Sequence, residues 1–336
     1  MTLVLKDRLD ASDVAAAVLR RISVRAPYFD LRDLSVEHDG TVRALVPLSA
    51  PTGLETGSME AAQAARHMAI LGSCAVAMQR DDDDRQHYLA TRAHFLRTAN
   101  VAEELVSQRP ERIAAIQTVA PPVDGSAELV EAEASGIWID RRSARALVKL
   151  YGTDGQLSHV LDVHFTVMAP RMFSRLMPAI DSELLRDDAA GAAAEAQMGL
   201  ATSNFAVSDA DDEEGVVVDC GLIPVDMCAG HFPDYPAAPV ALVMGRLARA
   251  SGVAMNRHLG FGDLTYSIDE ARVVATKLGR AGQRLILRAR HERRVGGSHL
   301  MVGTAEADGE VIGEMELTLS VTCLPEPIPF PVGALA

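Results

Sequence analysis

The sequence predicts an α+β fold built from two related tandem units, each a curved antiparallel sheet wrapped round one long central helix. Three observations predict it: an internal repeat, a long helix rich in small residues in each half, and strand-like segments with hairpin turns after each helix. At 336 residues the chain is about twice the length of a typical domain. We expect the two units at residues 1–170 and 202–336, joined at 171–201 by a linker that contains a helix.

The repeat is visible without inserting a gap. Residues 53–78 align with residues 231–256, and the same offset aligns residues 88–95 with 266–273. This alignment superposes Tyr88 on Tyr266 and Ala93 on Ala271. Self-similarity at one fixed offset indicates that a single structural unit occurs twice.

Both halves show the same order of predicted elements. Each begins with strand-like residues around a turn, at 38–40 and 213–215, and continues into a long helix, at about 58–78 and 239–258. Strands are predicted after the helices, at 88–95, 266–275 and 284–292, and hairpins turn at Asp154-Gly155 and Asp308-Gly309. A helix rich in alanine and glycine can approach a curved sheet closely and bury most of its circumference.

Composition excludes several classes of protein. Hydrophobic residues make up 48% and charged residues 23% of the chain, as in a globular protein. Apolar stretches are interrupted before they reach a membrane-spanning length and no secretory signal precedes them, so we expect a cytoplasmic protein without a membrane partner. The net charge of −14 disfavours nucleic acid as a partner.

The cysteines and the runs of charged residues give weaker indications of function. The four cysteines show no close pairing, so we expect reduced thiols and no metal or other cofactor. A basic run at residues 277–294 offers a contact for a phosphate or an acidic carrier protein, although a solvated strand face is the simpler interpretation. The acidic run at 81–84 is interpreted as a solvated loop.

A short motif directly before the second helix carries the chemistry. Gly230, His231, Phe232 and Pro233 stand in sequence, and Pro239 introduces the helix. This segment resembles the active-site loop of bacterial β-hydroxyacyl-acyl carrier protein dehydratases, which have the hotdog fold. The resemblance implies two tandem hotdog units and a carbon–oxygen lyase. It also implies a substrate that is a thioester of acyl carrier protein or coenzyme A, in fatty acid or polyketide-type biosynthesis.

The chemistry also follows from the residues. A histidine held by this turn can serve as a general base near neutral pH, with Phe232 excluding water. The first free amides of the helix, at Val240 and Ala241, can polarise a thioester carbonyl and so acidify its α-carbon. Pro239 is suited to the helix start because its missing donor costs nothing there.

The resemblance implies that the two halves are not equivalent. In the dehydratase family a site combines the histidine of one unit with an acid on the central helix of the other. Gly53 occupies the place of the histidine in the first half, and Gly245 occupies the place of the acid in the second. One composite site is therefore lost, while the other pairs His231 with His67, which stands at the position of the acid.

Polar residues follow one face of the first helix. Glu60, Gln63 and His67 stand at i, i+3 and i+7 and are candidate site residues. Protonated His67, supported by Glu60, is one candidate acid, and Glu60 itself is another. The alternative is that this face contacts solvent or forms hydrogen bonds across the interface between the units. Cys228 is a conceivable nucleophile, but a small buried cysteine is the simpler interpretation.

Three functions remain in competition at this stage. The leading one is dehydration of a β-hydroxyacyl thioester, or a related double-bond isomerisation, with His231 as the base. A hotdog thioesterase would instead use a helix-borne carboxylate, such as Glu60, to direct water. The third is a non-catalytic acyl-binding or partner subunit. By analogy with the fold we also expect a possible homodimer.

Overall fold

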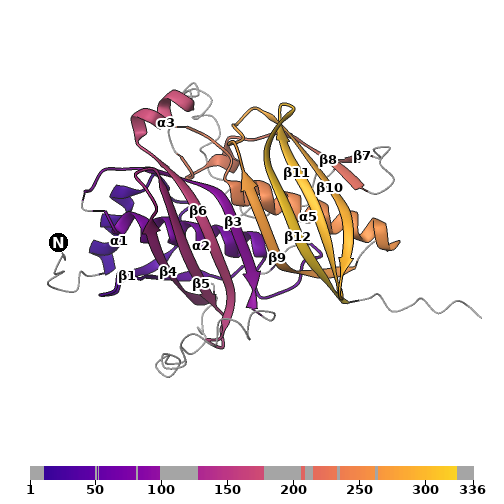
Figure 1. The fold of residues 1–336 in the computed structure, drawn as a ribbon, viewed down its shortest axis with the longest axis horizontal. Coiled ribbons are helices and arrows are strands. Elements are labelled where there is room, and N and C mark those ends of the chain that lie inside the picture. Colours follow the sequence, from indigo (N-terminus) through magenta and orange to yellow (C-terminus); the bar gives the residue numbers. More distant parts are fainter. Residues whose placement is uncertain are drawn as a thin grey trace, which may run out of the picture.

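The computed structural model describes residues 11–49, 51, 53–80, 82–98, 128–177, 206–208, 215–232, 235–261 and 264–323. Within these residues one antiparallel sheet of twelve strands runs the length of the molecule (Figure 1). In the first half the elements are α1 (Ala11–Arg21), β1 (Arg32–Val36), β2 (Val42–Pro47), α2 (Ala61–Met78), β3 (His87–Arg97), β4 (Leu129–Trp138), β5 (Ser143–Tyr151), β6 (Leu157–Met168) and α3 (Pro170–Leu176). In the second half they are β7 (Ala206–Ser208), β8 (Gly215–Leu222), η5 (Asp226–Cys228), α5 (Val240–Leu259), β9 (Thr265–Ala275), β10 (Arg284–Val295), β11 (Ser298–Ala307) and β12 (Glu310–Cys323).

The strand order is the same when it is followed from either edge. It runs β1-β2-β4-β5-β6-β3 from one edge and β7-β8-β10-β11-β12-β9 from the other, so β3 and β9 join the halves. In that central ladder His94 pairs with Arg272, and Ala93 pairs with Val273. The offset of the sequence repeat also relates His94 to Arg272, which places an approximate two-fold axis at this pair.

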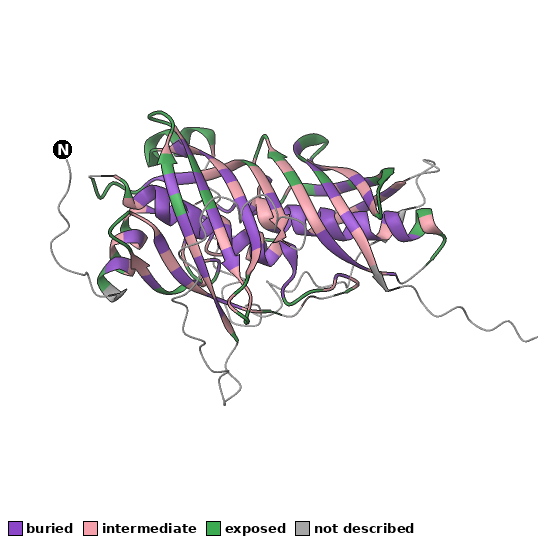
Figure 2. Cartoon of the chain, turned by 60° about the horizontal axis from the view of Figure 1, so that its bottom comes forward, coloured by how far each residue is buried: buried purple, intermediate pink, exposed green. Residues whose placement is uncertain are grey.

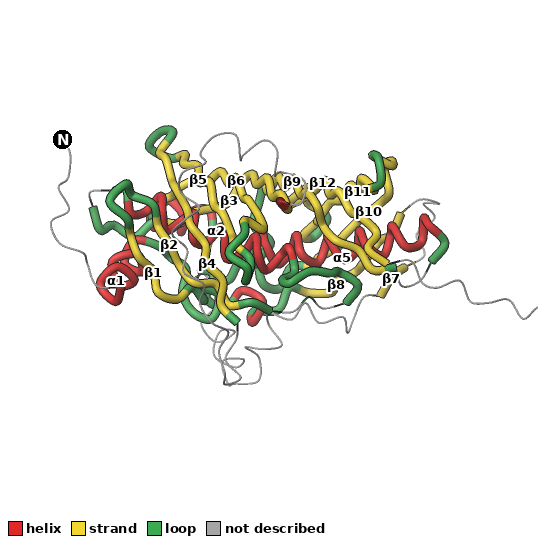
Figure 3. Tube along the Cα trace, turned by 90° about the horizontal axis from the view of Figure 1, so that it is seen from below, coloured by secondary structure: helices red, strands yellow, loops and turns green. Residues whose placement is uncertain are grey.

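Both long helices lie on the same face of the sheet (Figure 3). Helix α2 packs on β4 and β5, and α5 packs on β10 and β11. Buried residues dominate both helices, whereas the strands alternate between buried and more exposed positions (Figure 2). Gly136 permits the close approach on β4, because a Cβ there would lie 2.7 Å from the amide nitrogen of Val76 in α2.

Most of the predicted elements are present with small shifts at their ends. The two hairpin turns are confirmed: Asp308 and Gly309 both have positive φ, 50° and 79°, and Gly155 has φ 73°. Helix α2 begins at Ala61, slightly later than expected, and β10 continues to Val295. The sequence interpretation did not identify α1 or β4. The expected turn residues Glu213 and Glu214, and residues 178–201 of the expected linker, lie outside the described residues, while the start of the linker belongs to α3.

The basic run is mostly neutralised by neighbouring carboxylates. Among the described residues Arg284 pairs with Asp219, and Arg288 pairs with Glu306. Lys277 and Arg290 likewise meet glutamates. These pairs favour the interpretation as a solvated strand face over a docking site for an acidic partner. No helix in the described part of the chain is long and apolar enough to cross a membrane.

Candidate active site

The loop that carries His231 packs against a segment of the other half. Gly230 has φ +75°, and a Cβ at this position would lie 2.4 Å from the carbonyl oxygen of Arg25. The amide of Arg25 in turn donates to the Gly230 carbonyl at 2.7 Å. Only glycine fits this contact, so residues from before the first helix position the loop that precedes the second. Pro233 of the motif lies outside the described residues.

The His231 imidazole is buried and held in one orientation. Its Nδ1 lies 3.0 Å from the carbonyl oxygen of Ala237, and because a carbonyl only accepts, Nδ1 carries the proton and Nε2 keeps its lone pair. The ring stacks on Phe232 at 4.0 Å and meets the Tyr28 ring edge-on at 5.1 Å. Burial lowers the pKa of His231 to about 4, opposed by the hydrogen bond to Ala237 and assisted by nearby His87. The imidazole is therefore a neutral base at pH 7.

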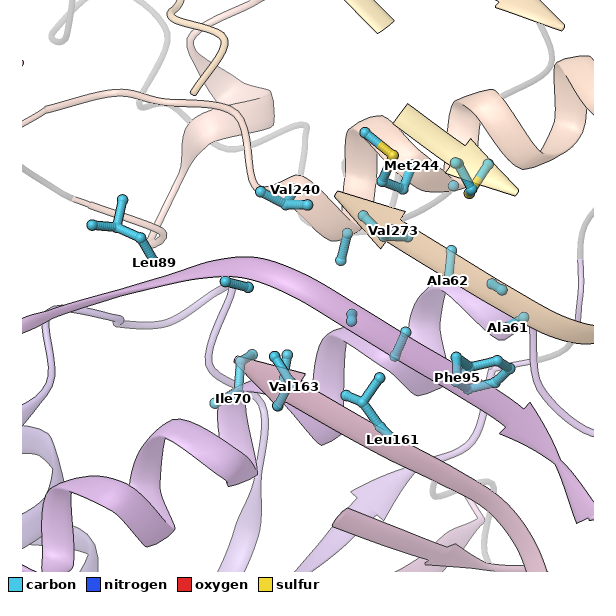
Figure 4. A pocket seen from close by; sticks show the side chains of 18 of the residues that line it. Ala61, Ala62, Ile70, Leu89, Phe95, Leu161, Val163, Val240, Met244 and Val273 are labelled. Carbon is cyan, nitrogen blue, oxygen red and sulfur yellow. The ribbon is translucent and has the colours of Figure 1, made fainter. Parts of the chain in front are cut away.

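His231 lines an apolar cavity of about 120 Å³ whose wall combines residues of both halves. Both long helices and strands β3, β6 and β9 contribute side chains to its wall, among them Ala61, Ile70, Leu89, Leu161 and Val273 (Figure 4). Among the described lining residues, the side chains that carry nitrogen or oxygen are those of His231, Tyr28, Ser73 and Tyr88. The cavity therefore suits an apolar chain with its polar end near His231.

The start of α5 lies at the same cavity. Pro239 is the N-cap residue, and its carbonyl accepts hydrogen bonds from the amides of Leu242 and Val243. Val240 and Ala241 line the cavity, and their amides precede the first helical hydrogen bonds. A carbonyl oxygen near these amides would meet hydrogen-bond donors and the positive end of the helix dipole.

The polar stripe of the first helix is buried but faces away from this cavity. Glu60, Gln63 and His67 are 3%, 5% and 2% exposed, and none of them lines the cavity. At 100° per residue Glu60 and His67 lie opposite Ala65 and Ala69, which do line it, whereas Gln63 lies to one side, near Ile70 of the lining. The structure thus brings His231, Gly230, Phe232, Pro239 and Val240 together, and it places Glu60, Gln63 and His67 elsewhere.

Glu60 is engaged with the other half. The Nε and Nη2 atoms of Arg249 on α5 donate to Glu60 Oε1 at 3.0 and 2.8 Å. Burial raises the pKa of Glu60, and Arg249 opposes the shift. The sequence left open that this face of the first helix forms hydrogen bonds across the interface between the units, and the pair of Glu60 with Arg249 is such a contact.

Arg66 and Tyr28 lie between His67 and His231. Nε2 of His67 lies 2.8 Å from Nη2 of Arg66, and since a guanidinium only donates, Nε2 accepts. Burial and the charge of Arg66 both hold the pKa of His67 well below its usual range. Arg66 donates to the Tyr28 carbonyl at 3.3 Å and lies 5.5 Å from the centre of its ring, and Tyr28 contacts His231. A protonated His67, as an acid would require, is disfavoured in this environment.

Two further groups bear on the chemistry. The sequence interpretation missed Glu55, which accepts a hydrogen bond from the Ala61 amide at 2.7 Å and lines a separate polar cavity with Arg97 and His159. Burial raises the pKa of Glu55 to about 7, although the Ala61 amide opposes the shift. For Cys228, burial raises the pKa to about 12, which keeps it a thiol and disfavours a nucleophilic role. No group of metal-binding side chains occurs among the described residues.

One large antiparallel sheet with long helices on a single face is the hotdog fold. Within that class, the chain is 30% identical over 115 residues to the 3-hydroxyacyl-[acyl-carrier-protein] dehydratase FabZ of Streptococcus equi subsp. zooepidemicus, a match that covers 34% of this chain and 82% of the relative. The FabZ of Thermotoga petrophila is 34% identical over 92 residues, 27% of this chain and 66% of the relative. The chain therefore belongs to the FabZ family of 3-hydroxyacyl-[acyl-carrier-protein] dehydratases.

Solved structures with a similar course of the chain are thioesterases by name. The 12:0-ACP thioesterase from Umbellularia californica gives a TM-score of 0.49 at 11% identity and covers 89% of this chain and 100% of its own. The tesB protein MAP1729c of Mycobacterium avium subs paratuberculosis gives 0.48 at 12% identity, with 94% and 100% covered. No protein-family model matches the chain.

Proposed function

We propose that this protein dehydrates 3-hydroxyacyl thioesters carried by acyl carrier protein or coenzyme A, at one site shared by two tandem hotdog units. The units correspond to residues 1–170 and 202–336. The observation that carries the proposal is the His231 imidazole, which is neutral, buried beside an apolar cavity and adjacent to the start of α5.

The geometry supports an elimination. The acyl chain occupies the apolar cavity, and the thioester carbonyl accepts hydrogen bonds from the amides at Val240 and Ala241, which acidifies the α-carbon. Nε2 of His231 removes the α-proton, the new C=C bond forms, and the β C–O bond breaks. The hydroxide takes up one proton as it leaves, so the products are an enoyl thioester and water.

The direct test is the product formed from a 3-hydroxybutyryl thioester. A dehydratase forms the conjugated enoyl thioester, which is followed by its ultraviolet absorbance. A thioesterase instead releases free thiol, which is followed with a thiol reagent. Release of thiol without an enoyl product, or neither product on either carrier, contradicts the proposal. Neither product would favour an acyl-binding subunit.

Activity should be lost on the acid side only at an unusually low pH. Because burial lowers the pKa of His231 to about 4, the base form persists well below the ordinary histidine range. We expect kcat/KM to stay constant down to about pH 5 and to fall only near pH 4. The measurement is the initial rate of enoyl formation between pH 4 and 8. As a control for unfolding, the protein is held at each pH and its activity is then measured near neutral pH. An acid limb near pH 6.5 would contradict the structure of this site.

Substitutions of His67 should separate an acid from a structural acceptor. Glutamine can accept the hydrogen bond from Arg66, whereas leucine cannot. We expect His67→Gln to keep dehydration within about five-fold and His67→Leu to lower the free energy of unfolding by about 1–3 kcal/mol. The checks are enoyl formation at 15 °C and denaturant titration of each variant. If His67→Gln is folded but inactive, His67 is the acid after all.

A further inference from the structure

The proposed elimination needs a proton donor that the expected residues do not provide. Hydroxide is a poor leaving group, so its departure requires protonation. No carboxylate stands among the described residues that line the cavity, and His67 and Glu60 face away from it. The candidates are therefore the three hydroxyl groups of the lining, those of Ser73, Tyr88 and Tyr28.

Two of these hydroxyls are poorly placed. The Ser73 hydroxyl donates to the carbonyl of Ile70 within its own helix at 2.7 Å. The Tyr88 hydroxyl is buried without a hydrogen-bond partner among the described residues, but the Tyr88 ring meets Phe165 at 6.3 Å and makes no ring contact with His231 there.

Tyr28 lies next to the base. Its ring meets the His231 imidazole at 5.1 Å with an angle of 63° between the planes, and it also lines the cavity. The Arg66 guanidinium is 5.5 Å from the centre of the same ring. Burial raises the pKa of Tyr28, and the charge of Arg66 opposes that rise, because a nearby cation favours the phenolate form.

We propose that Tyr28 is the general acid of this site and takes the place of the helix carboxylate; the inference rests on the proposed dehydration. His231 accepts the α-proton at Nε2, and the Tyr28 hydroxyl gives its proton to the departing hydroxide, which leaves as water. The imidazolium and the phenolate then neutralise each other, because one proton passes from His231 back to Tyr28. Arg66 is a positioning residue that holds Tyr28 and stabilises the phenolate.

The test compares two leaving groups in one variant. Tyr28→Phe keeps the ring contacts with His231 and Arg66 and removes only the hydroxyl. We expect kcat on a 3-hydroxybutyryl thioester to fall about 100-fold with little change in KM. Elimination of chloride from the 3-chlorobutyryl thioester needs the base but no acid, because chloride leaves unprotonated. That rate should stay within about three-fold of the unsubstituted protein, which also shows that the variant is folded.

Matched controls distinguish the possible failures. Tyr151→Phe makes the same change in β5, outside the cavity, and should leave both rates unchanged. If Tyr28→Phe slows both eliminations equally, or neither, the assignment of Tyr28 is wrong. If Tyr88→Phe selectively slows the hydroxyl substrate instead, the acid is Tyr88. An unsubstituted protein that eliminates neither group overturns the proposed function itself, and the role of Tyr28 with it.

Discussion

Replacing His231 with alanine should lower kcat/KM for dehydration by about 10²–10⁴-fold, the usual contribution of a general base. The imidazole is the one basic side chain among the described residues that line the cavity, and its Nε2 is the atom left free to take the α-proton. The measurement is the rate of enoyl formation from a 3-hydroxybutyryl thioester. The same variant should also lose elimination of chloride, because both reactions begin with removal of the α-proton.

The control for this substitution is His164→Ala. His164 lies on β6 with 41% of its side chain exposed, and it does not line the cavity. It should leave the rate unchanged. Activity that survives in His231→Ala would mean that another group takes the α-proton. The elimination mechanism on this cavity would then be wrong, whatever the products are.

Much of the fold could be predicted because the repeat constrains both halves at once. The offset that aligns the helices also relates His94 to Arg272, and these residues pair at the centre of the sheet. Turn residues such as Asp308 and Gly309 need positive φ, a local requirement that the sequence displays directly. Strand β4 was harder to find, although its buried residues alternate, because Ala132, Ala134 and Gly136 are too small to give a strong hydrophobic period.

The site could be predicted only where it depends on adjacent residues. The loop from Gly230 to Phe232 and the helix start at Val240 are close in the chain, and both are at the cavity. The face of α2 that meets the cavity depends on how the helix is rotated against β3 and α5. The periodicity of residues along the helix does not reveal that rotation. Tyr28 lies outside the aligned repeat. The contact of Arg25 with Gly230 holds its segment beside His231, so only the folded chain brings Tyr28 to the site.

The buried ion pair between Glu60 and Arg249 should be the most sensitive electrostatic contact of the interface. Their side chains are 5% and 8% exposed, so either charge without the other is costly. We expect Arg249→Met to lower the free energy of unfolding by about 3–5 kcal/mol, because it leaves Glu60 buried without this cation. Denaturant titration measures the change. Arg145→Met, which breaks an exposed pair with Asp162, should cost less than about 1 kcal/mol.

A double variant separates the structural role of Glu60 from a catalytic one. Glu60→Gln combined with Arg249→Met removes both charges, and we expect it to recover most of the stability that Arg249→Met loses. Because Glu60 faces away from the cavity, the double variant should keep dehydration close to that of the unsubstituted protein. A folded double variant that has lost dehydration would instead mean that this charged pair acts in the reaction and does more than join the halves. Stability and activity measured on this one protein therefore decide between a contact that joins the halves and a group that acts on the thioester.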